Sequence, residues 1–151
     1  IIRGLVGSEM CIRDRVHTSR CMAKRLSKAL REKRRWLGVL IHPRLSDRSA
    51  VEETLEDLSK TLTTQPKLRL MDFVRQDQRS NGEAATQLSQ QHPKGGLAIV
   101  RTPLSAVHEL RSLLEEETSF DNLGIMGLTT SGKIRLVRQR LGLPRPKRER
   151  K

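Results

Sequence analysis

Apolar residues along the chain occur in two patterns: short runs, and longer stretches in which one apolar residue recurs every three or four positions. Short runs with β-branched or alternating members predict four strands: 36–41, 68–74, 97–101 and 123–128. Apolar positions at helical spacing predict three helices: 49–62, 103–114 and 131–141. The predicted order is therefore strand, helix, strand, strand, helix, strand, helix.

Residues that favour helix ends give the predicted boundaries. Ser49 and Glu52 have the spacing of a capping box, so the first helix is expected to begin there. Thr102 followed by Pro103 supplies an N-cap and a proline at the first helical position for the second helix. Gly142 is expected to end the third helix, because glycine readily adopts the left-handed conformation found at helix C-termini.

This element order is that of the split βαβ, or ferredoxin-like, arrangement, βαββαβ. We expect an α+β fold in which 68–74 and 97–101 pair as a hairpin of an antiparallel sheet. Two helices would cover one sheet face, and the additional C-terminal helix would lie elsewhere. Residues 75–95 are polar and exceed ordinary loop lengths, so they are expected to form a mobile insertion.

The chain is expected to hold one folded domain between basic ends. The predicted parts are a non-native or disordered extension at 1–21, a basic arm at 22–35, an α+β domain at 36–142 and a basic disordered tail at 143–151. Residues 5–14 resemble a translated transposase sequencing adapter, and charged residues interrupt any apolar core of a signal peptide. The natural start is then expected at Met22.

Composition favours a polyanionic partner. The net charge is +13 with a pI near 11.0, which indicates nucleic acid before a membrane. No stretch is long and apolar enough to span a bilayer. Aromatic residues, on which sequence-tolerant single-strand binders stack bases, are few. Both cysteines, Cys11 and Cys21, lie in the doubtful extension, so no disulfide framework is predicted and a cytoplasmic setting fits.

Basic residues concentrate at the two ends of the expected domain. Seven lie in 22–35 and nine in 133–151, each segment with a single acid. A solvated charge run is the alternative, but concentration at both ends favours RNA, because each Lys or Arg on a phosphate releases counterions. Arg135 and Arg138 are i, i+3 neighbours and are expected to form an outward basic stripe on the last helix.

The turn before the last helix is a near match to the P-loop. Gly127, Gly132 and Lys133 have the required spacing, but Ile134 stands where a hydroxyl side chain should hold Mg²⁺. Nucleotide hydrolysis is therefore a remote alternative. Thr130 or Ser131 is expected to cap the helix, and the N–H groups of the Ser-Gly turn suit a phosphate, including one of RNA.

No arrangement typical of a catalyst is present. The four histidines share no metal-ligand spacing, and no Ser/His/Asp or Cys/His set is suggested. The acids at 52–57 are expected to be a solvated helix face. We predict no catalytic residue and no metal ligand in this chain.

Three motifs resemble those of archaeal ribonuclease P protein component 2. Residues 30–36 (LREKRRW) are similar to the family's basic entry to its first strand, and residues 96–101 (GLAIVR) to its strand before a helix. Residues 129–135 (TTSGKIR) look like its turn before a basic terminal helix, with Lys133 in place of threonine and Thr129 in place of glycine. The resemblance covers about 30–142.

The resemblance implies a non-catalytic subunit of the ribonucleoprotein that removes 5′ leaders from precursor tRNA. Its partners would be the catalytic RNA, which holds Mg²⁺ and performs the hydrolysis, protein component 3, and indirectly precursor tRNA, with no membrane. The protein itself would bind no cofactor. The alternative is a general or ribosome-associated RNA-binding protein. The residues expected to contact RNA are Arg31, Lys33, Arg34, Arg35, Ser131, Gly132, Lys133, Arg135, Arg138 and Arg140.

Overall fold

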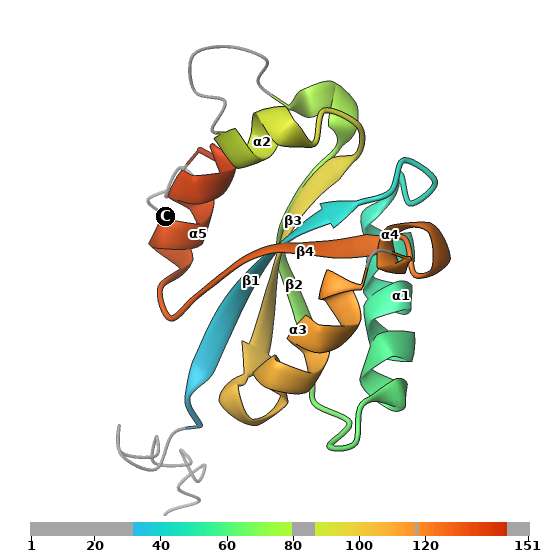
Figure 1. Cartoon of the computed structure of the whole chain (residues 1–151), viewed down its shortest axis with the longest axis vertical. Helices are drawn as coiled ribbons and strands as arrows, with labels where there is room; N and C mark the ends of the chain where they lie inside the picture. The colour runs from blue at the N-terminus through green and yellow to red at the C-terminus, as the bar shows by residue number, and fades with distance from the viewer. Residues whose placement is uncertain (1–31, 80–86, 117, 145–151) are drawn as a thin grey trace, which may run out of the picture. The chain divides into compact units, whose positions relative to one another are not determined.

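The protein forms a four-stranded antiparallel sheet with helices on both faces (Figure 1). The computed structural model describes residues 32–79, 87–116 and 118–144. The strands are β1 (Arg34–Ile41), β2 (Arg69–Val74), β3 (Gly96–Pro103) and β4 (Ile125–Ser131). Their order in the sheet is β2-β3-β1-β4, and the expected hairpin of β2 with β3 is confirmed. In the part described, no helix is long and apolar enough to cross a membrane.

The helices follow the strands in the predicted order. The longer ones are α1 (Arg48–Thr61), α3 (Val107–Glu115) and α5 (Ile134–Leu141). Shorter pieces are the α-helical turns α2 (Gln87–Gln91) and α4 (Ser119–Asn122) and the 3₁₀ turns η1 (Gln76–Gln78) and η2 (Leu104–Ala106). These four short elements were not predicted from the sequence.

Two apolar cores lie on opposite faces of the sheet. The α1 and α3 side is the larger and includes Leu55 and Leu110 packed on alternate residues of β1 and β3. The α5 side contains Leu97, Ile99 and Leu141. Figure 1 shows α1 and α3 on one side of the strands and α5 on the other. Burial of both faces makes the central strands almost wholly apolar, which agrees with the short unbroken runs in the sequence.

Two predicted helix starts are wrong. The first helix begins after Asp47, whose carbonyl accepts the N–H of Val51 at 3.2 Å, so Ser49 lies inside the helix and forms no capping box. The second helix does not begin at Thr102, because β3 continues through Pro103. Thr102 is fully buried and pairs with Arg35 in the sheet. The sheet ladder therefore overrides the local N-cap signal.

The last strand and helix also differ in their bounds from the prediction. Strand β4 ends at Ser131 rather than at residue 128, and neither Thr130 nor Ser131 is the N-cap of α5, because that position is Lys133. Pairing of β4 with β1 from Ile41 as far as Trp36, which lies opposite Ser131, extends the strand. The predicted end is confirmed: Gly142 has φ 69° and its N–H donates to the carbonyl of Gln139.

The β2–β3 insertion is organised around one buried guanidinium. Arg79 is 9% exposed, and its Nη1 donates to the carbonyls of His92 (2.7 Å) and Gly95 (2.8 Å). Its Nη2 donates to the carbonyl and hydroxyl oxygens of Ser89 at 2.7 and 2.9 Å. Burial lowers the pKa of Arg79. The described ends of the insertion thus contain η1 and α2, held by hydrogen bonds of Arg79, where the sequence predicted a long, mobile loop. Residues 80–86 lie outside the described part, so the mobility of the insertion stays a prediction.

Candidate nucleic-acid interface

One row of side chains crosses the whole sheet at the start of α5. Strand pairing places Ser131 opposite Trp36, Trp36 opposite Arg101, and Arg101 opposite Arg69. Directly opposed residues project from the same face of a sheet. The four residues therefore form a continuous strip, which we call the Trp36 row, on the same face as α5. Its tryptophan is half-buried, and its outermost arginine is exposed.

The Trp36 row carries positive charge that forms no ion pair with an acid of the described residues. Arg34, two positions before Trp36, shares its face and is exposed. Among the described residues, the side chains of Arg34, Arg69 and Arg101 have no ion pair or hydrogen bond to an acid. Desolvation first, and then the positive charges of Arg34 and Arg69, lower the pKa of Arg101, while Glu32 acts weakly in the other direction. Three arginines thus share one patch in which Glu32 is the acid that acts on Arg101, and it does so without a salt bridge.

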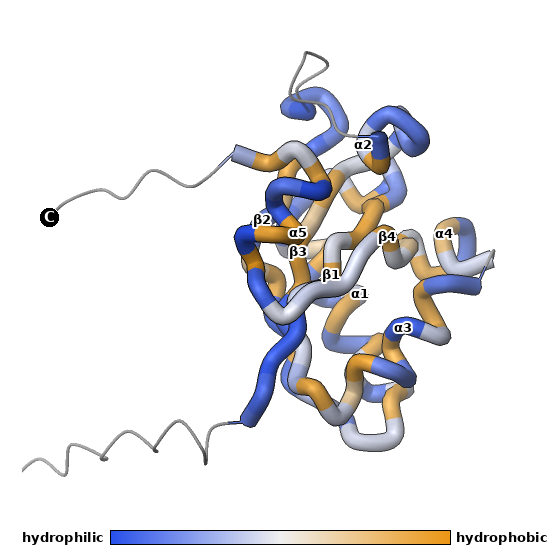
Figure 2. The backbone as a smooth tube through the Cα atoms, turned by 60° about the vertical axis from the view of Figure 1, so that its left-hand side comes forward, coloured by the Kyte–Doolittle hydropathy of each residue, from blue (hydrophilic) through white to orange (hydrophobic). Residues whose placement is uncertain are grey.

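The Ser-Gly turn lies beside the start of β1. The Ser131 hydroxyl accepts the N–H of Lys133 at 3.2 Å, and α5 begins at the next residue. A Cβ at Gly132 would lie 3.1 Å from Nη1 of Arg35, so this guanidinium lies over the turn. Figure 2 shows the hydrophilic run that leads into β1. The structure therefore brings together two predicted groups, the basic entry to β1 and the turn before α5.

The basic residues of α5 do not form one outward stripe. Arg138 is directed to β2, where its Nε and Nη2 donate to the two carboxylate oxygens of Asp72 at 2.6 and 3.1 Å. Arg140 donates to the Thr129 hydroxyl at 2.9 Å and to the carbonyl of Thr130. The prediction that Arg138 is a free phosphate contact is therefore corrected: its side chain is only 16% exposed and holds the helix on the sheet.

The remaining predicted contacts divide into accessible residues and one that is not described. Lys33, Arg34, Gly132, Lys133 and Arg135 are exposed. Arg31 lies outside the described residues, as do the basic arm before it and the chain from residue 145 onward.

Sequence reasoning missed Arg69 and Arg101. Each lies in a predicted strand, and neither was among the residues expected to contact RNA. Nothing local to either residue indicates that the two are directly opposed, because β-sheet register joins positions far apart in the chain. The register of β2 on β3 places Arg69 opposite Arg101, and the register of β3 on β1 places Arg101 opposite Trp36. Knowledge of both registers would have been needed to group these residues.

The similarity to a P-loop does not extend to its geometry. Four of the five residues from Gly127 to Ser131 pair with β1, so most of the would-be phosphate loop is strand. A P-loop needs a glycine-rich loop whose N–H groups surround the phosphates. The remote alternative of a P-loop nucleotide site therefore loses its structural basis here.

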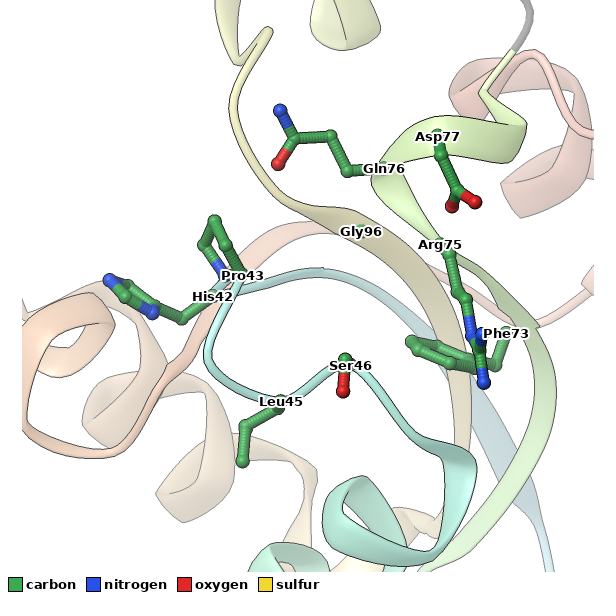
Figure 3. Close-up of a pocket in the computed structure, with 9 residues that line it drawn as sticks. All are labelled: His42, Pro43, Leu45, Ser46, Phe73, Arg75, Gln76, Asp77 and Gly96. Atoms are coloured by element: carbon green, nitrogen blue, oxygen red, sulfur yellow. The ribbon is translucent and has the colours of Figure 1, made fainter.

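A separate pocket lies at the other end of β1. Its volume is about 410 Å³, and Phe73, Leu45 and Pro43 provide apolar walls (Figure 3). Two of its polar side chains already interact within the protein. Arg75 Nη2 forms an ion pair with Asp47 at 2.6 Å, and Nδ1 of His42 accepts the N–H of Arg44. Among the described residues, no group of three or more His, Cys, Asp or Glu could hold a metal ion. We assign no chemistry to this pocket.

Comparison with known proteins identifies no relative of this chain. No protein-family model matches the chain, and no curated protein or solved structure matches it significantly.

Proposed function

We propose that the protein binds RNA through the basic end of its sheet, as the non-catalytic protein subunit of ribonuclease P. The observation that supports RNA binding is the gathering of cationic residues at this end. Arg34, Arg69 and Arg101 share the sheet face of the Trp36 row, Arg35 lies over the turn at Gly132, and the exposed Lys133 and Arg135 follow that turn in the chain. Such a cluster, in which Arg34, Arg69 and Arg101 form no salt bridge to an acid of the described residues, favours a ligand that brings its own negative charge at regular intervals.

The more specific assignment rests on the motifs described from the sequence. The three motifs similar to archaeal ribonuclease P protein component 2 run through β1, β3 and the turn before α5, and each supplies residues to the basic end. We also propose that the βαββαβ order with strand order β2-β3-β1-β4 is the ferredoxin-like topology. In this role the catalytic RNA would hold Mg²⁺ and cleave precursor tRNA, and this chain and protein component 3 would support it.

RNA affinity as a function of salt tests the first part of the proposal. Replacing Arg69 and Arg135 with alanine should weaken binding and flatten the plot of log K against log salt, by about 0.7 to 0.9 for each lost phosphate contact. Arg48 and Arg111 on α1 and α3 are the matched controls, since both are exposed, each pairs with a glutamate on its own helix, and both lie on the other sheet face. Equal effects of the two double variants would contradict the assigned surface.

The identity of the bound RNA tests the second part. Cross-linking in cells followed by sequencing should recover the ribonuclease P RNA, and the purified protein should raise precursor-tRNA cleavage in a reconstitution with that RNA and protein component 3. Recovery of ribosomal RNA alone would support the general or ribosome-associated RNA-binding alternative. Cleavage by the protein without the RNA would overturn the non-catalytic assignment.

A further inference from the structure

The Trp36 row combines an aromatic ring with arginines in a way that phosphate binding alone does not require. Trp36 is half-buried, and within the described residues it has no aromatic neighbour; the one ring contact there joins His42 and Phe120. It touches the edge of the apolar core under α5. Across the sheet, Trp36 lies opposite Arg101 in β3 and Ser131 in β4. Tryptophan here lies between an apolar core and a charged, solvent-facing patch.

The position of the row on a sheet face determines which nucleic acid fits. Adjacent strands are separated by about 4.8 Å, so Trp36, Arg101 and Arg69 lie in a row of roughly 10 Å across the sheet face. A sheet face cannot enter the deep, narrow major groove of an RNA duplex. An unpaired RNA segment can instead lay one base on an aromatic ring or a guanidinium plane while its phosphates meet cations beside it.

From this arrangement we infer that the Trp36 row is a binding site for an unpaired RNA segment, with one base stacked on Trp36 and the flanking phosphates on Arg101, Arg69 and Arg34. This inference rests on the proposed RNA-binding function and specifies its ligand as single-stranded rather than duplex. The α5 helix sets one boundary of the site. Its Arg138 and Arg140 engage Asp72 and Thr129, at the two ends of the next row of the sheet, so the site cannot extend beneath it.

The chain contains its own reporter for this test. Trp36 is the single tryptophan of the sequence and there is no tyrosine, so the intrinsic fluorescence comes from the proposed stacking residue. Titration of the full chain with an unstructured RNA octamer should quench this fluorescence at the same concentrations that give binding by anisotropy of a labelled octamer. An RNA duplex of the same base composition should bind more weakly and leave the fluorescence nearly unchanged.

Substitutions at Trp36 separate stacking from packing. Trp36→Leu keeps an apolar contact with the α5 core but removes the ring, and should weaken octamer binding about 5- to 100-fold. Trp36→Phe should retain most of the affinity. The salt slope should be unchanged in Trp36→Leu, because stacking releases no counterions, whereas Arg101→Ala should reduce it by about 0.7. Urea unfolding of each variant shows whether the fold is retained.

The outcomes distinguish this inference from the function on which it rests. If the wild-type chain binds the octamer but Trp36→Leu binds it equally well, or binding leaves the fluorescence unchanged, Trp36 is a packing residue and the inference is overturned while RNA binding stands. Equal affinity for duplex and octamer would also overturn it. If the wild-type chain binds neither RNA, the proposed function itself fails.

Discussion

Gly38 of β1 lies directly against Leu141 of α5, and the absence of a side chain at this glycine lets the helix approach the sheet. A Cβ at position 38 would lie 2.8 Å from Leu141 Cδ1, 2.9 Å from Thr129 Cγ2 and 3.0 Å from Val137 Cγ1. All three distances are shorter than normal carbon–carbon contact. Because two of the contacts come from α5, this one position sets the distance between the helix and the sheet face.

Gly38→Ala should therefore destabilise the protein by about 1–3 kcal/mol, because an added methyl group overpacks a filled core. Urea unfolding monitored by circular dichroism measures the change. Gly132→Ala is the control, since its Cβ would meet only the end of the flexible Arg35 side chain at 3.1 Å. That control should change stability by less than about 0.5 kcal/mol. A similar loss in both variants would show that α5 does not pack on Gly38 as described.

The ion pair between Arg138 and Asp72 should be a stabilising link between α5 and β2. Its side chains are 16% and 26% exposed, so removing one partner leaves a charge in a partly desolvated place. We expect Asp72→Ala to cost about 1–3 kcal/mol in the free energy of unfolding. In a double-mutant cycle with Arg138→Ala, the double variant should lose less than the sum of the single losses. Additive losses would argue against a direct interaction.

Arg79 should determine the order of the β2–β3 insertion. Arg79→Met removes four hydrogen bonds of 2.9 Å or shorter to Ser89, His92 and Gly95 and leaves buried carbonyl groups unpaired. We expect a loss of about 2–3 kcal/mol and faster cleavage within 75–95 under limited proteolysis. Arg75→Met, at an exposed ion pair near the same insertion, is the matched control and should change the cleavage rate little. Unchanged proteolysis in Arg79→Met would contradict this role.

Glu109 should make a small, pH-dependent contribution to stability. Hydrogen bonds from the backbone N–H and then the hydroxyl of Thr63, at 2.9 and 2.8 Å, lower its pKa below the usual 4.5. A carboxylate whose pKa is lower in the folded state stabilises the fold above its unfolded pKa, and this contribution is lost as the pH falls through the folded pKa. The melting temperature of Glu109→Gln should therefore be lower than that of the wild type at pH 7. The difference should shrink as the pH falls below about 4; a difference that is constant with pH would contradict this account.

The sequence alone determined much of the local structure. Residues Val51, Leu55 and Leu58 are buried on α1 as their spacing predicted, since helical periodicity is a property of near neighbours. The end of α5 at Gly142 was likewise predictable, because a positive φ favours glycine wherever it occurs. The βαββαβ order followed from the same local patterns, and α1 and α3 share one sheet face as expected, but the position of α5 on the opposite face was not predicted.

Only the tertiary structure decided which polar residues meet. A β-bulge between Leu70 and Asp72 breaks the alternation of β2, so that Asp72 lies opposite Ile99 on the α5 face, although strict alternation would place it with Leu70. That single shift lets Asp72 bind Arg138, which the sequence had marked as a free RNA contact. Strand register likewise placed Arg69 and Arg101 beside Trp36. Register depends on long-range pairing and on how both faces pack, and residues adjacent in the chain do not contain that information.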